Sequence, residues 1–223
     1  MTHETVFLFD VDNTLLDNDR IHDDLDEHFR AAHGARARDR YWEIFDKLRD
    51  ELGYVDYFGS LERYRLEAMC DPGVLRTSNW LIDYPFADRL YPGALDAVNH
   101  VRRWGPVVIL SDGDAVFQPR KVERSGLWRV FEGHVLIYVH KEAALDDVAR
   151  RYPAGHYVVI DDKLWILDAI KQSWGSRVTT VFARQGHYAA DPDVLAKYPH
   201  GEIEVSHIAD LVGHDFSDSA RQR

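Results

Sequence analysis

The sequence has a single cysteine, Cys70, among its 223 residues. One thiol cannot form an intramolecular disulfide, and a metal cluster held by several cysteine thiolates is excluded. Proteins without disulfides are typical of reducing compartments. We therefore expect this protein to be cytoplasmic.

Long apolar runs and strongly basic segments are lacking as well. The stretch MTHETVFLFDVDN has no positively charged region, and Asp10 and Asp12 interrupt its apolar run, so we expect neither a secretory signal nor a membrane span. Lys and Arg number 27 against 38 Asp and Glu, which gives a formal net charge of -11. This acidic balance argues against non-specific binding to nucleic acid, whose phosphates need clustered cations.

The sequence does contain an alternation of predicted strands and helices. Five short runs rich in β-branched and aromatic residues predict buried strands, at 5–9, 107–110, 134–139, 157–160 and 178–182. Apolar residues recur at helical spacing at 95–101, 144–152 and 164–174. Gly105 and Gly175 stand where a helix C-terminus favours a residue tolerant of positive φ. This pattern predicts a doubly wound, mostly parallel α/β sheet that binds ligands at the carboxyl ends of its strands.

The stretch from Leu16 to about Arg89 breaks this alternation. Apolar residues there recur at helical spacing at 21–32, 42–52 and 61–69, with no convincing strand. We therefore predict a helical domain of residues 17–88 inserted after the first strand, and a core domain of residues 1–16 and 89–223. The aromatic residues of the insert are expected to form its own core rather than to stack on a ligand.

Two aspartates, Asp10 and Asp12, follow the first predicted strand two positions apart. If the extended backbone continues, both side chains leave the same face. Two carboxylates at one site disfavour their joint ionisation unless a cation neutralises them, and carboxylate oxygens suit Mg²⁺. An acidic turn that caps the next helix would have the same spacing, so the pair alone leaves both interpretations open.

Polar residues also end three other predicted strands. They are Ser111, Asp112 and Gly113 after the second, Lys141 past the third, and Asp161 and Asp162 after the fourth. The ends of parallel strands converge, so these groups would combine a metal site, a hydroxyl, backbone amides and one ammonium group. That combination fits phosphoryl transfer, in which positioning and charge stabilisation supply most of the catalysis. Taken singly, Ser111 could be a helix N-cap, Lys141 an exposed lysine, and one of the acidic pair a cap of the next helix.

In this order the residues resemble the four motifs of the haloacid dehalogenase superfamily. The first motif, aspartate-x-aspartate-x-threonine, stands as Asp10 to Thr14 in FLFDVDNTL; Ser111 matches the second, Lys141 the third, and Asp161 with Asp162 the fourth. The insert corresponds to a helical cap of the type that this family places between motifs one and two. Asp112 and Glu142 depart from the pattern, since many members have asparagine and proline there.

The resemblance implies a Rossmann-like core with a helical cap and a magnesium-dependent phosphohydrolase acting on a small phosphomonoester. Asp10 would be the nucleophile that becomes an aspartyl phosphate, and Asp12 the acid/base that protonates the leaving group and then activates water. Ser111, with amides near Asp112 and Gly113, would hold the transferring phosphoryl oxygens.

The resemblance also implies a cation at the nucleophile and a metal ligand set. Lys141 would neutralise charge on the phosphoryl group and on the nucleophile, and Lys121 is the alternative lysine for this role. The implied ligands of Mg²⁺ are Asp10, the carbonyl of Asp12, and the acidic pair, with Asp162 as first choice and Asp161 beside it.

Other functions are compatible with parts of this pattern. The dehalogenase branch of the family works without metal and lacks the second aspartate of the first motif, so Asp12 and the acidic pair argue against it. A phosphomutase uses the same residues and differs in how the cap controls water. A non-enzymatic phospho-acceptor such as a receiver domain is shorter and places its lysine last, and a member kept only for partner binding stays a further alternative. The pattern predicts no particular oligomeric state.

Overall fold

The computed structural model describes residues 3–69 and 71–217, so Cys70 lies outside the described residues. Within them, six strands form one parallel sheet in the order β3-β2-β1-β4-β5-β6. The strands are β1 (His3–Phe9), β2 (Val107–Asp112), β3 (Val135–Tyr138), β4 (Ala154–Asp161), β5 (Val178–Ala183) and β6 (Ile203–Val205). The predicted doubly wound sheet is confirmed, and β6 is a strand that the prediction did not include.

Helices cover both faces of this sheet. They are α5 (Ala94–Val101), α6 (Phe117–Arg124), α7 (Leu127–Val130), α8 (Leu145–Arg151), α9 (Leu164–Trp174), α10 (Gly186–Ala190) and α11 (Pro192–Lys197), with 3-10 turns η1 (Phe86–Arg89), η2 (Lys141–Ala143), η3 (Gly175–Arg177) and η4 (Ile208–Gly213). Phe7 and Phe9 pack in one apolar cluster together with α5, whereas Val6 and Leu8 pack in another together with α9. Because both faces of β1 are buried over residues 6–9, that part of its sequence is a continuous apolar run.

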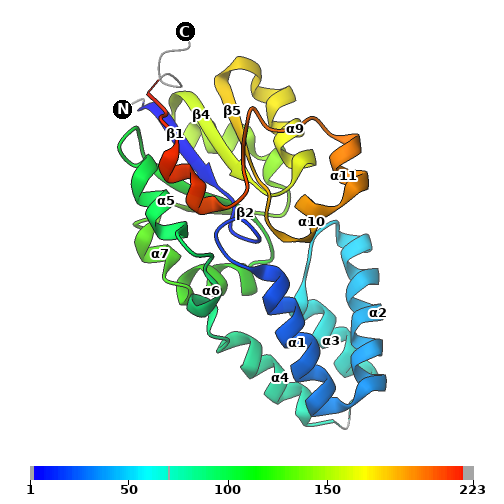
Figure 1. Ribbon diagram of the computed structural model, residues 1–223. Helices are drawn as coiled ribbons and strands as arrows, with labels where there is room; N and C mark the ends of the chain where they lie inside the picture. The colour runs from blue at the N-terminus through cyan, green and yellow to red at the C-terminus, as the bar shows by residue number, and fades with distance from the viewer. Residues whose placement is uncertain (1–2, 70, 218–223) are drawn as a thin grey trace.

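Four helices follow β1 and lie together beyond the carboxyl end of that strand (Figure 1). They are α1 (Asn18–His33), α2 (Ala35–Leu52), α3 (Tyr57–Glu67) and α4 (Gly73–Ile82). The ring of Phe29 on α1 packs against Tyr41 on α2 and Tyr64 on α3, with centroids 4.6 and 5.2 Å apart. A helical insert after the first strand is therefore observed, with an aromatic interior of its own. The division into residues 17–88 and the remainder stays a prediction.

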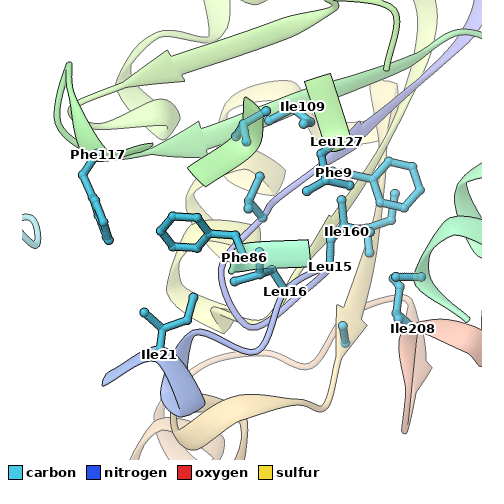
Figure 2. Close-up of a cluster of buried hydrophobic side chains, with 14 of the residues drawn as sticks. Phe9, Leu15, Leu16, Ile21, Phe86, Ile109, Phe117, Leu127, Ile160 and Ile208 are labelled. Atoms are coloured by element: carbon cyan, nitrogen blue, oxygen red, sulfur yellow. The ribbon is translucent and has the colours of Figure 1, made fainter. Parts of the chain in front are cut away.

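The two ends of the insert are joined to each other and to the sheet. The amide of Asp17 donates to the carbonyl of Arg89 at 2.8 Å, and the amide of Tyr91 donates to the carbonyl of Leu15 at 2.9 Å. Figure 2 shows the buried side chains of this junction, including Phe9, Ile109 and Ile160 from the sheet and Leu15, Leu16, Ile21, Phe86 and Phe117 around it. The apolar core thus continues from the sheet into the first helix of the insert.

Glycines at two predicted helix ends have different roles. Gly175 follows α9 with φ +56°, as predicted for a C-cap. Gly105 does not cap α5, which ends at Val101, so that prediction is wrong. A Cβ atom at Gly105 would lie 2.1 Å from the carbonyl oxygen of Thr5, so glycine is needed there for close approach of two backbones.

Within the described part of the chain, no helix has the combination of length and apolar character that crossing a membrane requires.

Candidate active site

Asp10 directly follows β1, the strand that lies between β2 and β4 in the sheet. Its amide donates to the carbonyl of Ile160 at 2.9 Å, and its side chain is only 2% exposed. Oδ1 accepts hydrogen bonds from Ser111 Oγ at 3.2 Å and from Lys141 Nζ at 2.7 Å, whereas the buried Oδ2 has no donor in the described part of the chain. Burial disfavours ionisation, but the positive charges of Lys141 and Lys163 outweigh it and hold the pKa of Asp10 below its ordinary value. Asp10 is therefore an ionised carboxylate with one free oxygen.

Ser111 lies within β2, in register with Ile137 of β3. Its hydroxyl accepts a hydrogen bond from Gln118 Nε2 at 3.0 Å and donates to Asp10. The alternative of a helix N-cap is therefore wrong for Ser111, because the strand continues beyond the position where it was predicted to end.

Lys141 begins η2 and is fully buried. Its Nζ lies 2.7 Å from Asp10 Oδ1, 2.6 Å from Asp161 Oδ2 and 4.0 Å from Asp112 Oδ2. Burial lowers its pKa, but these three carboxylates raise it well above the ordinary value. The alternative of an exposed first-turn lysine is therefore wrong, and Lys141 is a charged group at the centre of the acidic cluster.

Asp10, Asp161 and Asp162 each place one carboxylate oxygen within 4.8 Å of the others. Burial raises the pKa of Asp161 to about 6 and raises the pKa of Asp162 well above its ordinary value. Asp161 contacts Lys141 and accepts a hydrogen bond from the Lys163 amide at 2.9 Å, whereas neither oxygen of the fully buried Asp162 has a donor within residues 3–69 and 71–217. A buried carboxylate without partners is costly, and hard oxygen ligands suit Mg²⁺. The free oxygens of Asp10 and Asp162 therefore fit a divalent cation.

Asp12 has a different cationic partner from Asp10. Lys121 Nζ lies 2.7 Å from Oδ1 and 2.8 Å from Oδ2 of Asp12, whose side chain is 23% exposed. The chain turns after β1, with the amides of Leu15 and Leu16 donating to the carbonyl of Val11, so the extended backbone considered for the pair does not continue. Among the described residues, Lys121 forms an ion pair with Asp12 and not with Asp10. The lysine that contacts Asp10 is therefore Lys141.

Asp112 and Gly113 hold the segment that carries the buried lysine. Asp112 Oδ1 accepts a hydrogen bond from the amide of Lys141 at 2.7 Å, and burial raises the pKa of Asp112. The amide of Gly113 donates to the carbonyl of Tyr138 at 2.9 Å. The Gly113 amide is therefore already hydrogen-bonded to β3. The phosphate-binding roles of Ser111, Asp112, Gly113 and Lys141 stay predictions.

A cavity of about 750 Å³ lies between this edge of the sheet and the helices of the insert. It is lined by Asp12, Asn13, Asn18, Asp19, His22, Asp23, Phe45, Arg49, Gly53, Tyr54, Val55, Tyr57, Asp112, Gly113, Asp114, Phe117, Gln118, Lys121, Val139, His140, Glu142, Lys163, Trp165, Ile166, His187 and Tyr188. The aromatic residues of the insert were expected mainly as core residues, and two of them, Phe45 and Tyr57, line the cavity as well. Lys163 was missed as a site residue, although its position directly after the acidic pair was a usable signal.

Comparisons with known proteins agree with this fold. A family model described as haloacid dehalogenase-like hydrolase matches residues 5–173, so the chain belongs to the haloacid dehalogenase-like hydrolases. A crystal structure of a haloacid dehalogenase-like hydrolase from Burkholderia xenovorans LB400 is 59% identical, covers 96% of this chain and 97% of that one, and has a TM-score of 0.92. No curated protein matches the chain.

More distant structures share the fold alone. The HAD-hydrolase YfnB from Bacillus subtilis, bound to magnesium, is 16% identical with a TM-score of 0.61, and the match covers 96% of this chain and 98% of that one. L-2-haloacid dehalogenase from Xanthobacter autotrophicus, with chloropropionic acid covalently bound, is also 16% identical over the same shares, with a TM-score of 0.60.

Proposed function

We propose that this protein is a magnesium-dependent phosphohydrolase that cleaves a small phosphomonoester through an aspartyl phosphate on Asp10. The observation that carries the proposal is Asp162, a fully buried carboxyl group whose two oxygens have no hydrogen-bond donor among the described residues, and which has an oxygen within 4.8 Å of a carboxylate oxygen of Asp10. Ionising such a group without a partner costs several kcal/mol, and a bound divalent cation offsets that cost. Asp161 already contacts Lys141, so the geometry favours Asp162 as the direct ligand.

The first chemical step uses the pair of carboxylates on the first motif. A carboxylate oxygen of Asp10 forms a bond to phosphorus while the bond from phosphorus to the leaving oxygen breaks, and Asp12 gives its proton to that oxygen. Ser111 and Lys141 both contact Oδ1 of Asp10, so they fix the direction of the nucleophile. A bound Mg²⁺ supplies charge stabilisation for the phosphoryl oxygens.

The second step returns the enzyme to its starting state. A water oxygen attacks phosphorus and passes a proton to Asp12, and the bond between Asp10 and phosphorus breaks to release inorganic phosphate. Lys141 then again compensates the charge of Asp10 in a buried site. The cavity of about 750 Å³ suits a small phosphorylated metabolite as the partner.

Hydrolysis of a 2-haloacid is the second candidate, because several structures of similar fold are L-2-haloacid dehalogenases. A departing halide needs no proton, so Asp12 would have no acid role in that reaction. The unpaired Asp162 would likewise have no use at a site that works without a cation. A phosphomutase of this family would use the same residues, and it is separated from the phosphatase by whether water receives the phosphoryl group.

The test compares two reactions of one metal-depleted preparation. Phosphate release from sugar phosphates, nucleotides and short organic phosphates, and chloride release from L-2-chloropropionate, are measured in excess chelator and then in excess MgCl₂. We expect phosphate release that requires Mg²⁺, and no chloride release. The variant Asp10→Asn should lower kcat at least about a thousandfold, whereas Asp168→Asn, whose carboxylate accepts a bond from Gln172 at the surface, should not.

Three results would refute the proposal. They are phosphate release that persists in chelator, an Asp10→Asn variant with the wild-type rate, and chloride release that is independent of Mg²⁺. Transfer of phosphate to a second organic acceptor, with no inorganic phosphate formed, would assign the mutase instead.

A further inference from the structure

Lys121 is a second buried lysine at the site, and the chemistry above does not use it. It lies on α6 with its side chain 1% exposed. Its Nζ contacts both oxygens of Asp12, at 2.7 and 2.8 Å, and Asn18 Oδ1 at 2.9 Å. An ammonium group has three donors, so these contacts use all of them.

The surroundings of Lys121 hold its ammonium group in place. Nζ lies 5.2 Å from the centroid of the Phe117 ring, which packs against Tyr57, Phe58 and Phe86 with centroids 5.1 to 5.5 Å apart. All three rings belong to the predicted insert, two from α3 and one from η1 at its end, whereas Phe117 belongs to α6 of the core. Moving the ammonium group would therefore require repacking of rings from both sides of the junction.

The two buried lysines have separate partners. Lys141 contacts Asp10 and Asp161, whereas Lys121 contacts Asp12 and the insert residue Asn18. With its three donors engaged, Lys121 has none left for a phosphoryl oxygen. Each carboxylate oxygen of Asp12 has further lone-pair capacity, so the contacts leave room for a proton on the side away from Lys121.

We propose that Lys121 is the positioning residue of Asp12, and that it aims this carboxyl group at the leaving oxygen. The inference rests on the proposed phosphohydrolase function. As the bond from phosphorus to the leaving oxygen breaks, that oxygen takes the proton of Asp12, and the resulting carboxylate stays paired with Lys121. Asn18 begins α1, so its contact makes the alignment depend on the position of the first helix of the insert.

The test exploits the basicity of the leaving group. An alkoxide must be protonated as it departs, whereas p-nitrophenolate is stable without a proton. The value of kcat/KM reports the steps up to departure of the leaving group and excludes the later hydrolysis of the aspartyl phosphate, which all substrates share. We therefore compare kcat/KM for a primary alkyl phosphate and for p-nitrophenyl phosphate in Mg²⁺.

The variant Lys121→Met keeps most of the stem and removes the donors. It should lower kcat/KM for the alkyl phosphate about a hundredfold, the low end for general acid catalysis, and for p-nitrophenyl phosphate less than about tenfold. Arg124→Met, at an exposed position on the same helix, is the matched control and should change neither value. Equal losses on the two substrates would refute the role of Lys121, and so would the same selective loss in the control.

A milder variant covers the case in which Lys121→Met does not fold. Asn18→Ala removes the third contact of Nζ and leaves both contacts to Asp12, so it should give a several-fold loss on the alkyl phosphate and a smaller one on p-nitrophenyl phosphate. A loss independent of the leaving group would count against the inference. Failure of the wild-type protein to hydrolyse any phosphomonoester would overturn the proposed function itself, so the two failures are distinguishable.

Discussion

Removal of divalent cations should make the acidic cluster a source of instability that grows with pH. Burial raises the pKa of Asp161 from 3.8 to about 6, so the folded state holds its proton more tightly than the unfolded state does. The contribution of this group to stability is greatest below 3.8 and is lost as the pH rises from 3.8 through about 6. Asp162 and Asp112 have raised pKa values and act in the same direction.

The size of the effect follows from the shift. Two pKa units correspond to about 3 kcal/mol, and for a chain of this length that is roughly 6 to 12 °C in Tm. The lowered pKa of Asp10 changes the free energy of unfolding only below 3.8, and the raised pKa of Lys141 changes it only above 10.5. Neither contribution therefore varies between pH 3.8 and about 6.

Three histidines act in the opposite direction, since partial or full burial lowers the pKa values of His22, His28 and His156. The measurement is therefore the difference between the wild-type protein and Asp161→Asn, in which these contributions cancel. Urea unfolding in EDTA is followed by tryptophan fluorescence from pH 4 to pH 7. We expect the stability of the wild-type protein to fall by about 3 kcal/mol relative to the variant across this interval.

Adding Mg²⁺ should reverse the loss, because a bound cation compensates the ionised carboxylates. At a hundredfold excess over Kd, the wild-type protein gains about 2.7 kcal/mol, and this gain should be larger at pH 7 than at pH 5. The gain should be reduced in Asp161→Asn. The reasoning would be refuted by a wild-type stability that rises with pH relative to the variant, or by equal stabilisation of both proteins by Mg²⁺.

Two further substitutions test the site and the fold. Lys141→Met removes the cation shared by two buried carboxylates and should cost about 3 to 5 kcal/mol in urea unfolding; a loss below about 1 kcal/mol would contradict the ion-pair geometry. Gly105→Ala places a Cβ atom against the carbonyl oxygen of Thr5 and should cost more than about 1 kcal/mol. Gly213→Ala, with nothing within 4 Å, is its control, and equal Tm values for the two would exclude the close approach.

Much of the fold could be predicted because the buried strands are continuous apolar runs. Residues 6–9 face two apolar layers, and that pattern has few alternatives. The strand β6 has three residues and an exposed glutamate at its centre, so it carries neither an apolar run nor a clear alternation. The helices α10 and α11 have five and six residues, too few for a helical period to be recognised.

The convergence of Asp10, Ser111, Lys141 and the acidic pair could be predicted from one rule, that the carboxyl ends of parallel strands meet at one edge. The pairing of Lys121 with Asp12 could not, because it depends on how α6 lies against the turn after β1. Likewise, the choice between Lys121 and Lys141 as the partner of Asp10 depends on three-dimensional distances of 2.7 Å that no spacing in the sequence encodes.

The place of β1 in the middle of the sheet has a consequence for synthesis of the chain. Ser111 and Lys141, which contact Asp10, follow it by 101 and 131 residues in the chain. The helices α1 to α4 can form from local contacts as they emerge from the ribosome, whereas β1 must wait for β2 and β4 as an unpaired apolar strand. A nascent chain thus exposes an aggregation-prone segment until β2 and β4 have been made, and the carboxyl group of Asp10 gains its surroundings only then.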